Sequence, residues 1–185
     1  MIAEVTFNLI SGQDKGVVYG FNTGIKNLKR GDVLIVDSQG KHQLANFVGY
    51  NKTTKYKPLK SVVRRATLEE RKVYWKKVEE RLLNKPLEIS EEAYQYYCNT
   101  FLKNENTSFD DTKKKLTRNV ILSSNFGKGK PKVFSRRHVF NYGSMEIRVI
   151  GNKIVHIKKN DQTKKFTKNK RKYHYLNDYF GLVGK

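Results

Sequence analysis

The spacing of hydrophobic residues changes at Thr67, and this change constrains the fold more than any other feature of the chain. Before it, residues 3–65 consist of short segments with apolar residues at every second position, separated by turn residues. Val5, Phe7 and Leu9, for example, share one face of the first segment. Five short strands with tight connections and no helix predict a small, curled β-barrel or sandwich.

The residues after this change have the spacing of helices. Thr67 and Glu70 have capping-box spacing, and apolar residues then recur at helical intervals: Leu68, Trp75, Val78 and Leu82. Lys85-Pro86 ends this helix, and Ser90 is expected to cap a second one with an apolar face of Tyr94, Tyr97, Cys98 and Phe101. We therefore predict a helical hairpin over residues 66–103.

The rest of the chain, 104–185, is predicted to be β-rich. "KNENTSFDDTKKK" (103–115) is almost free of apolar residues and indicates a linker or exposed loop, followed by a strand in "NVILSSNF". Gly151-Asn152 is a favoured two-residue turn within a hairpin. If Ile150 pairs with Lys153, then Ile147 lies opposite His156, which places His156 on the more apolar face.

Together these patterns predict an α+β protein with three parts. They are a small β-barrel (1–65), a helical hairpin that acts as a connector (66–103) and a basic β-rich domain (104–185).

The charge of the chain favours a polyanionic partner. Lys and Arg number 38 against 17 Asp and Glu, a net charge of +21. The three parts carry +7, 0 and +14 in chain order, so both ends are basic and the middle is neutral. Each phosphate that a protein neutralises releases condensed counterions, which drives nucleic-acid binding.

Several basic segments are candidates for phosphate contact. In the terminal stretch 158–180, Phe166, Tyr173, His174 and Tyr175 are interleaved with the charges and could stack on unpaired bases. The candidate nucleic-acid-binding residues are Lys29, Arg30, Lys41, His42, Lys128, Lys130, Lys132, Arg136, Arg137, His138, Lys168, Lys170, Arg171 and Lys172.

Two alternatives remain open. The protein could bind a host protein machine, such as RNA polymerase or the ribosome, through Trp75, Tyr94 and Phe101. It could instead be a metal-independent ribonuclease in which His138, Arg136, Arg137, Arg148 and His156 surround a scissile phosphate. No phosphate-loop, HExxH or GxSxG motif occurs in the sequence, and no cofactor or metal site is expected.

Cys98 is the single cysteine, so an internal disulfide is excluded. No apolar run reaches the length of a membrane span, and we expect a cytoplasmic protein without membrane contact.

The first part also resembles a known module. The turn "LKRGD" precedes the strand "VLIV", a segment of the "VYGF" kind lies before it, and a later strand ends in "FVGY". This pattern, over residues 3–65, resembles the amino-terminal barrel of primosomal helicases, which recognises the 3′ end of a DNA strand. The resemblance implies nucleic-acid binding but no ATPase, because no helicase motif follows. We expect a non-enzymatic nucleic-acid-binding protein. Its small size, its Lys and Asn bias and the lack of any standard enzymatic motif suit an accessory or regulatory protein of a phage or a mobile element.

Overall fold

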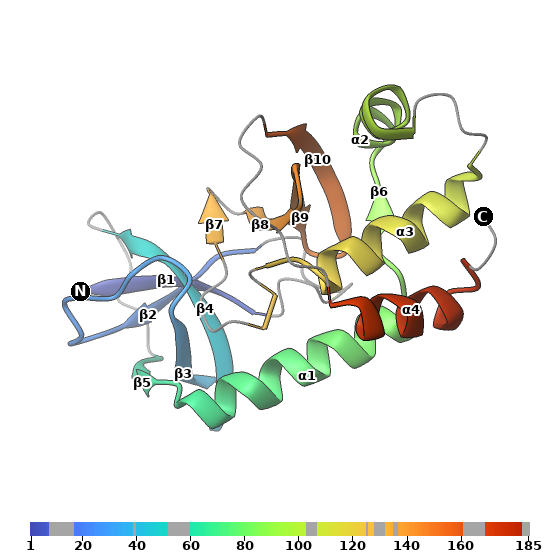
Figure 1. Ribbon diagram of the computed structural model, residues 1–185. Helices are drawn as coiled ribbons and strands as arrows, with labels where there is room; N and C mark the ends of the chain where they lie inside the picture. Colours follow the sequence, from blue (N-terminus) through green and yellow to red (C-terminus); the bar gives the residue numbers. More distant parts are fainter. Residues whose placement is uncertain are drawn as a thin grey trace.

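The computed structural model describes residues 1–7, 17–38, 40–51, 60–102, 107–124, 126–127, 132–134, 137–160 and 169–182. Two five-stranded sheets and four α-helices make up this part of the chain (Figure 1). The α+β class is therefore confirmed. None of the helices within these ranges is long and apolar enough to cross a lipid bilayer.

The first sheet is a curled half-barrel of antiparallel strands. It comprises β1 (Ile2–Thr6), β2 (Tyr19–Asn22), β3 (Val33–Ser38), β4 (Lys41–Asn51) and β5 (Val62–Arg65), in the order β2-β1-β4-β3-β5. Alternate residues of its strands form a core inside the curl, including Val5, Phe21, Leu34, Val36 and Phe47. The other face of β3, with Val33 and Ile35, packs against Ala66 and Leu44. The curled five-stranded unit expected from the sequence is thus present.

Helix α1 (Leu68–Asn84) begins where the sequence predicts. The hydroxyl of Thr67 accepts a hydrogen bond from the Glu70 amide at 3.2 Å, and the Glu70 carboxylate accepts one from the Thr67 amide at 2.8 Å. Its buried residues are Tyr74, Trp75, Val78 and Leu82. The prediction that Leu68 joins this apolar face is wrong, because Leu68 lies in the first turn and is 55% exposed.

The second sheet has the order β6-β10-β9-β8-β7. Its strands are β6 (Glu88–Ile89), β7 (Lys132–Phe134), β8 (Arg137–Tyr142), β9 (Met145–Ile150) and β10 (Lys153–Lys159). Strand β6 follows α1 directly and pairs in parallel with β10, with Lys153 opposite Glu88. The second sheet therefore includes β6, a strand that precedes its other four strands in the sequence.

The β9–β10 hairpin contains a bulge that the sequence analysis missed. Ile150 pairs with Lys153 and Val149 with Ile154, as predicted. The register then shifts, so that Ile157 rather than His156 lies opposite Ile147 and is buried. An extra residue in one strand moves every following side chain to the other face. His156 therefore lies opposite Arg148, away from the apolar face.

The three helices after α1 are α2 (Glu91–Tyr97), α3 (Phe109–Ile121) and α4 (Lys170–Tyr179). A π-helical turn over Cys98–Leu102 continues α2. Ser90 caps α2 as predicted. The linker and strand expected around α3 are wrong: Ser108 caps this helix, and Asp110 and Asp111 occupy its first turn. Leu116, Val120 and Ile121 bury its apolar side.

One hydrophobic core joins all four helices to the second sheet. It includes Trp75 and Leu82 of α1, Tyr97 of α2, Leu116 of α3 and Leu176 of α4. The helical segment expected to connect two domains therefore shares its core with the C-terminal sheet. Helix α1 also contacts the first sheet, since the side-chain nitrogen of Asn46, Nδ2, donates a hydrogen bond to the Tyr74 hydroxyl at 3.2 Å.

Candidate nucleic-acid interface

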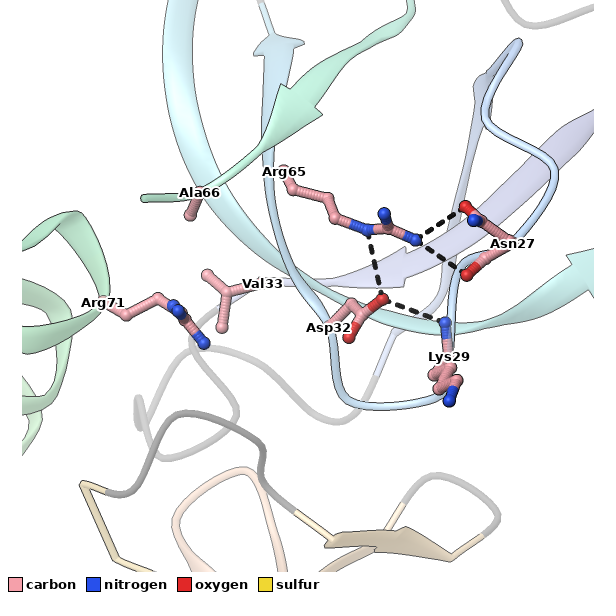
Figure 2. A pocket seen from close by; sticks show the side chains of 7 residues that line it. All are labelled: Asn27, Lys29, Asp32, Val33, Arg65, Ala66 and Arg71. Carbon is pink, nitrogen blue, oxygen red and sulfur yellow. Dashed lines mark hydrogen bonds and ion pairs between the residues drawn. The ribbon is translucent and has the colours of Figure 1, made fainter. Parts of the chain in front are cut away.

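A pocket of about 390 Å³ lies where the half-barrel meets the start of α1. The loop between β2 and β3, the end of β5 and the first turn of α1 contribute to its wall (Figure 2). Its lining residues are Asn27, Lys29, Asp32, Val33, Arg65, Ala66 and Arg71. We call this site the basic pocket, because three of the seven side chains are cationic and one is acidic.

The guanidinium of Arg65 is held in place on one side of the basic pocket. It donates hydrogen bonds to the backbone oxygen and the side-chain oxygen of Asn27, at 2.7 and 2.8 Å. Its Nε lies 3.5 Å from the carboxylate of Asp32, which is buried and also accepts a hydrogen bond from the Lys29 amide at 2.9 Å. The one carboxylate of the pocket therefore orients Arg65 and closes the turn before β3.

Among the described residues, the other two cations, Lys29 and Arg71, have no such counter-ion. Nε of Arg71 donates a hydrogen bond to the Thr67 backbone oxygen at 3.3 Å. In the part of the chain that the structure describes, no carboxylate lies within ion-pair distance of Lys29 or Arg71. Figure 2 shows the guanidinium groups of Arg65 and Arg71 with Val33 between them. Guanidinium groups that line a pocket are the donors that bind a phosphate or another oxyanion in proteins.

The sequence predicted part of this site. Lys29 lines the pocket, whereas Arg30 lies outside its wall and its Nε donates to the Val48 backbone oxygen at 2.7 Å. Arg65 and Arg71 were missed. The available signal was the "RR" at the end of a strand, directly before a capping box, which places cations at a strand-to-helix corner.

Lys41 and His42 lie elsewhere on the half-barrel. Both are exposed at the start of β4, where Lys41 pairs with Ser38, whereas Val33 and Asn46 pair near the other end of the hairpin. The pocket lies beyond Val33, so the structure does not bring Lys41 and His42 to it. They remain predicted phosphate contacts at the opposite end of β3 and β4.

The first turn of α4 carries three of the predicted cations. Lys170 and Arg171 are exposed, but the Lys172 ammonium lies 2.8 Å from the carboxylate of Glu79 in α1. It also lies 6.0 Å from the centre of the Phe126 ring. Lys172 therefore fixes α4 to α1, and only Lys170 and Arg171 keep their charges directed to solvent.

His138 is not a surface residue, which corrects its proposed role in phosphate contact. Its ring is 1% exposed, lies parallel to Phe140 at 6.2 Å, and neither ring nitrogen has a hydrogen-bond partner among the described residues. Burial lowers the pKa of the His138 imidazole to about 3, so the group is neutral near pH 7. A neutral, enclosed imidazole cannot contact a phosphate at the surface.

Among the residues suggested for ribonuclease chemistry, the three with described side chains, His138, Arg148 and His156, do not form one site. Arg148 lies opposite His156 and Val139, on one face of the second sheet. His138 lies opposite Val149, whose side chain is buried on the other face. Arg148 is also paired with Glu146 at 2.8 Å. The two histidines therefore cannot act on one phosphate from opposite faces of a sheet.

The remaining cations of the predicted set fall on parts of the chain that lack a full description. Lys128, Lys130, Arg136 and Lys168 lie outside the described residues. Lys132 and Arg137 belong to β7 and β8, but their side chains are outside the description.

The aromatic residues predicted to bind a protein partner are largely used inside the fold. Trp75 is 4% exposed and packs between Tyr74 and Phe126, at 5.5 and 5.0 Å, so it is not available to a partner. Tyr94 and Phe101 are half-buried, and each packs on another ring: Tyr94 on Phe109 and Phe101 on Tyr97. The docking surface expected on the helical hairpin therefore loses its largest side chain.

Fold and charge thus define a basic α+β protein with a pocket lined by Lys29, Arg65 and Arg71. A family model, YorE, matches residues 87–179, half of the chain, and the protein belongs to this family. The family name is associated with phage, which makes this a phage-related protein. Neither the curated proteins nor the solved structures contain a match. The family match begins next to β6 and ends with α4, so the helicase resemblance of residues 3–65 stays a prediction.

Proposed function

We propose that this YorE-family protein binds nucleic acid through the phosphate backbone, as a non-enzymatic accessory or regulatory protein of a phage. The observation that carries the proposal is the basic pocket, in which Lys29, Arg65 and Arg71 come from three separate segments around one cavity. Asp32, the single carboxylate among the described residues that line it, is already bound to Arg65 and to a backbone amide. A phosphate would thus meet cations without an unpaired acidic neighbour.

Helix α1 supports a second contact at a fixed distance from the pocket. Arg71 lines the pocket and Glu79 holds Lys172 of α4. These two residues of α1 are separated by about 12 Å along the helix axis. The ion pair therefore keeps the exposed Lys170 and Arg171 close to the same helix that supports the pocket.

The local helix dipole also favours an anion at α4. Its first turn contains only cations, at the end where the backbone dipole is positive, and acidic residues are preferred there. Bound phosphate would relieve this unfavourable arrangement. The attraction between these cations and phosphates is electrostatic, so the affinity for nucleic acid should fall steeply as the salt concentration rises.

The test is Arg71→Gln, compared with Lys77→Gln as a matched control. Lys77 is exposed on the same helix and does not line the pocket, so both variants lose one positive charge. Binding of a fluorescein-labelled oligonucleotide is measured by anisotropy at several salt concentrations. We expect Arg71→Gln to weaken binding and to reduce the slope of log K against log salt by about 1. Lys77→Gln should change neither.

Two results would contradict the proposal. One is the absence of binding at low salt by the unchanged protein. The other is an equal effect of the two substitutions, which would mean that net charge matters and the pocket does not.

A further inference from the structure

The exposed side of α4 carries a row of one cation and two aromatic rings. Arg171, Tyr175 and Tyr179 recur at intervals of four residues, so they lie next to one another along one side of the helix. Tyr175 is 52% exposed and Tyr179 is 47% exposed, so about half of each side chain is open to solvent. We call these three residues the tyrosine row.

The opposite side of α4 is firmly attached to the fold. Leu176 and Phe180 are buried in the core. The Arg118 guanidinium of α3 donates a hydrogen bond to the Asn177 side-chain oxygen at 2.6 Å and lies 4.7 Å from the centre of the Tyr173 ring. With the ion pair of Lys172, these contacts fix the helix on two sides. The tyrosine row is therefore a surface of an ordered element.

The two rings are held in place before any ligand binds. Their centroids are 6.1 Å apart and their planes are inclined by 43°. Tyr179 also packs edge-to-face on Phe180 at 5.6 Å. Each ring is thus restrained by a neighbour on one side and has close to half of its surface open to solvent. Restrained aromatic rings lose little side-chain entropy on binding.

The charges around the tyrosine row fit a polyanion. Lys170 and Arg171 are exposed on α4, and Asp178 is the only acidic residue of this helix. A base has a flat π-face that stacks on tyrosine, and a backbone phosphate pairs with arginine or lysine. In a duplex the faces of the bases are covered by their neighbours, so only unpaired bases can stack in this way.

We propose that the tyrosine row stacks unpaired bases, and that the nucleic acid bound by this protein is single-stranded. This inference rests on the proposed function, because the basic pocket supplies the phosphate contact. DNA and RNA share both the π-faces and the phosphates. The test therefore includes both.

The experiment measures anisotropy of labelled oligo-dT and oligo-U, the matching duplexes, and an oligonucleotide with abasic sites. The variants are Tyr175→Ala with Tyr179→Ala, and Tyr175→Phe with Tyr179→Phe. Tyr96→Ala serves as a control, since Tyr96 is an exposed tyrosine of α2. Circular dichroism of each variant reports whether the helices are retained.

We expect the double alanine variant to bind single strands at least about 25-fold more weakly, about fivefold for each ring. The double phenylalanine variant and Tyr96→Ala should bind as the unchanged protein does, because a phenyl ring still stacks. Abasic sites should weaken binding of the unchanged protein and have little effect on the alanine variant.

Failure of this inference differs from failure of the proposed function. Equal affinity for single strands and duplexes, with no effect of the tyrosine substitutions, would overturn the stacking role and leave phosphate binding in place. Binding of neither form would overturn both. Unchanged affinity for an abasic strand would also contradict the inference.

Discussion

The ammonium of Lys172 in α4 lies 2.8 Å from the carboxylate of Glu79 in α1, and the two residues are 93 positions apart in the sequence. Both side chains are partly buried, with 33% and 26% of their surface exposed. This ion pair joins α4, the carrier of the tyrosine row, to the helix that lines the basic pocket.

Glu79→Gln is expected to lower the free energy of unfolding by up to about 1 kcal/mol, because it leaves a partly buried ammonium without its counter-ion. The measurement is urea denaturation at low and high salt. Glu80→Gln is the matched control, since Glu80 is more exposed and lies 4.0 Å from Lys76. The difference between the variants should decrease as salt rises. Equal stability of both variants at low salt would mean that the pair does not stabilise α4.

His138 makes the stability of the fold depend on pH. The unfolded chain takes up a proton on this imidazole near pH 6.5, whereas burial lowers its pKa to about 3 in the folded protein. The unfolded state therefore binds more protons between these values. Neutral His138 contributes fully to the free energy of unfolding above pH 6.5. This contribution is lost as pH falls towards 3, and the free energy of unfolding then decreases by up to about 1.4 kcal/mol per pH unit.

The variant His138→Leu should remove this slope and retain an apolar side chain against Phe140. Denaturation midpoints at pH 7, 6 and 5 would test the prediction, with His42→Gln as a control because His42 is exposed on β4. Parallel pH profiles for the unchanged protein and His138→Leu would show that the imidazole is not buried in solution.

The capping box at α1 gives a third prediction. Thr67→Ala removes the hydroxyl that accepts a hydrogen bond from the Glu70 backbone amide. We expect this to lower the free energy of unfolding by about 1 kcal/mol. Thr67→Ser keeps this acceptor and should restore most of the loss. Thermal or urea unfolding of the three proteins gives the comparison. A Thr67→Ser variant as unstable as Thr67→Ala would contradict the capping role.

The same box has a pH dependence of known sign. Hydrogen bonds from Arg64 and from the Thr67 backbone lower the pKa of the Glu70 carboxyl to about 2. Because this pKa is lower in the folded state than in the unfolded chain, the ionised Glu70 carboxylate contributes fully to the stability of the fold above pH 4.5. This contribution is lost as pH falls towards 2. The pKa is measurable by NMR titration, and substitution of Arg64 by Gln should raise it.

Local signals in the sequence predicted the elements whose residues are close together in the chain. The capping box at Thr67, the cap at Ser90 and the turn at Gly151-Asn152 depend on spacings of a few residues, and all three are present. The helix α3 was missed because its polar first turns hide an apolar stripe of Leu116, Val120 and Ile121. A single bulge was enough to misplace His156.

Contacts between distant segments could not be predicted in the same way. Nothing near His138 in the sequence marks it as buried, because its enclosure comes from residues such as Phe140 and from the packing of one sheet face. The basic pocket combines Lys29 with Arg65 and Arg71, which only the curl of the first sheet brings together. The pairing of β6 with β10 likewise joins residues more than 60 positions apart.

The uninterrupted course of α1 has a geometric consequence for any bound strand. One end of this helix lines the basic pocket and the other half holds α4, without a proline or glycine between Arg71 and Glu79. A continuous helix changes length only in steps of 1.5 Å per residue and turns by about 100° with each. Under the proposed function, the spacing between the two phosphate contacts would therefore depend on the number of residues in α1, and an inserted residue would both lengthen and rotate it.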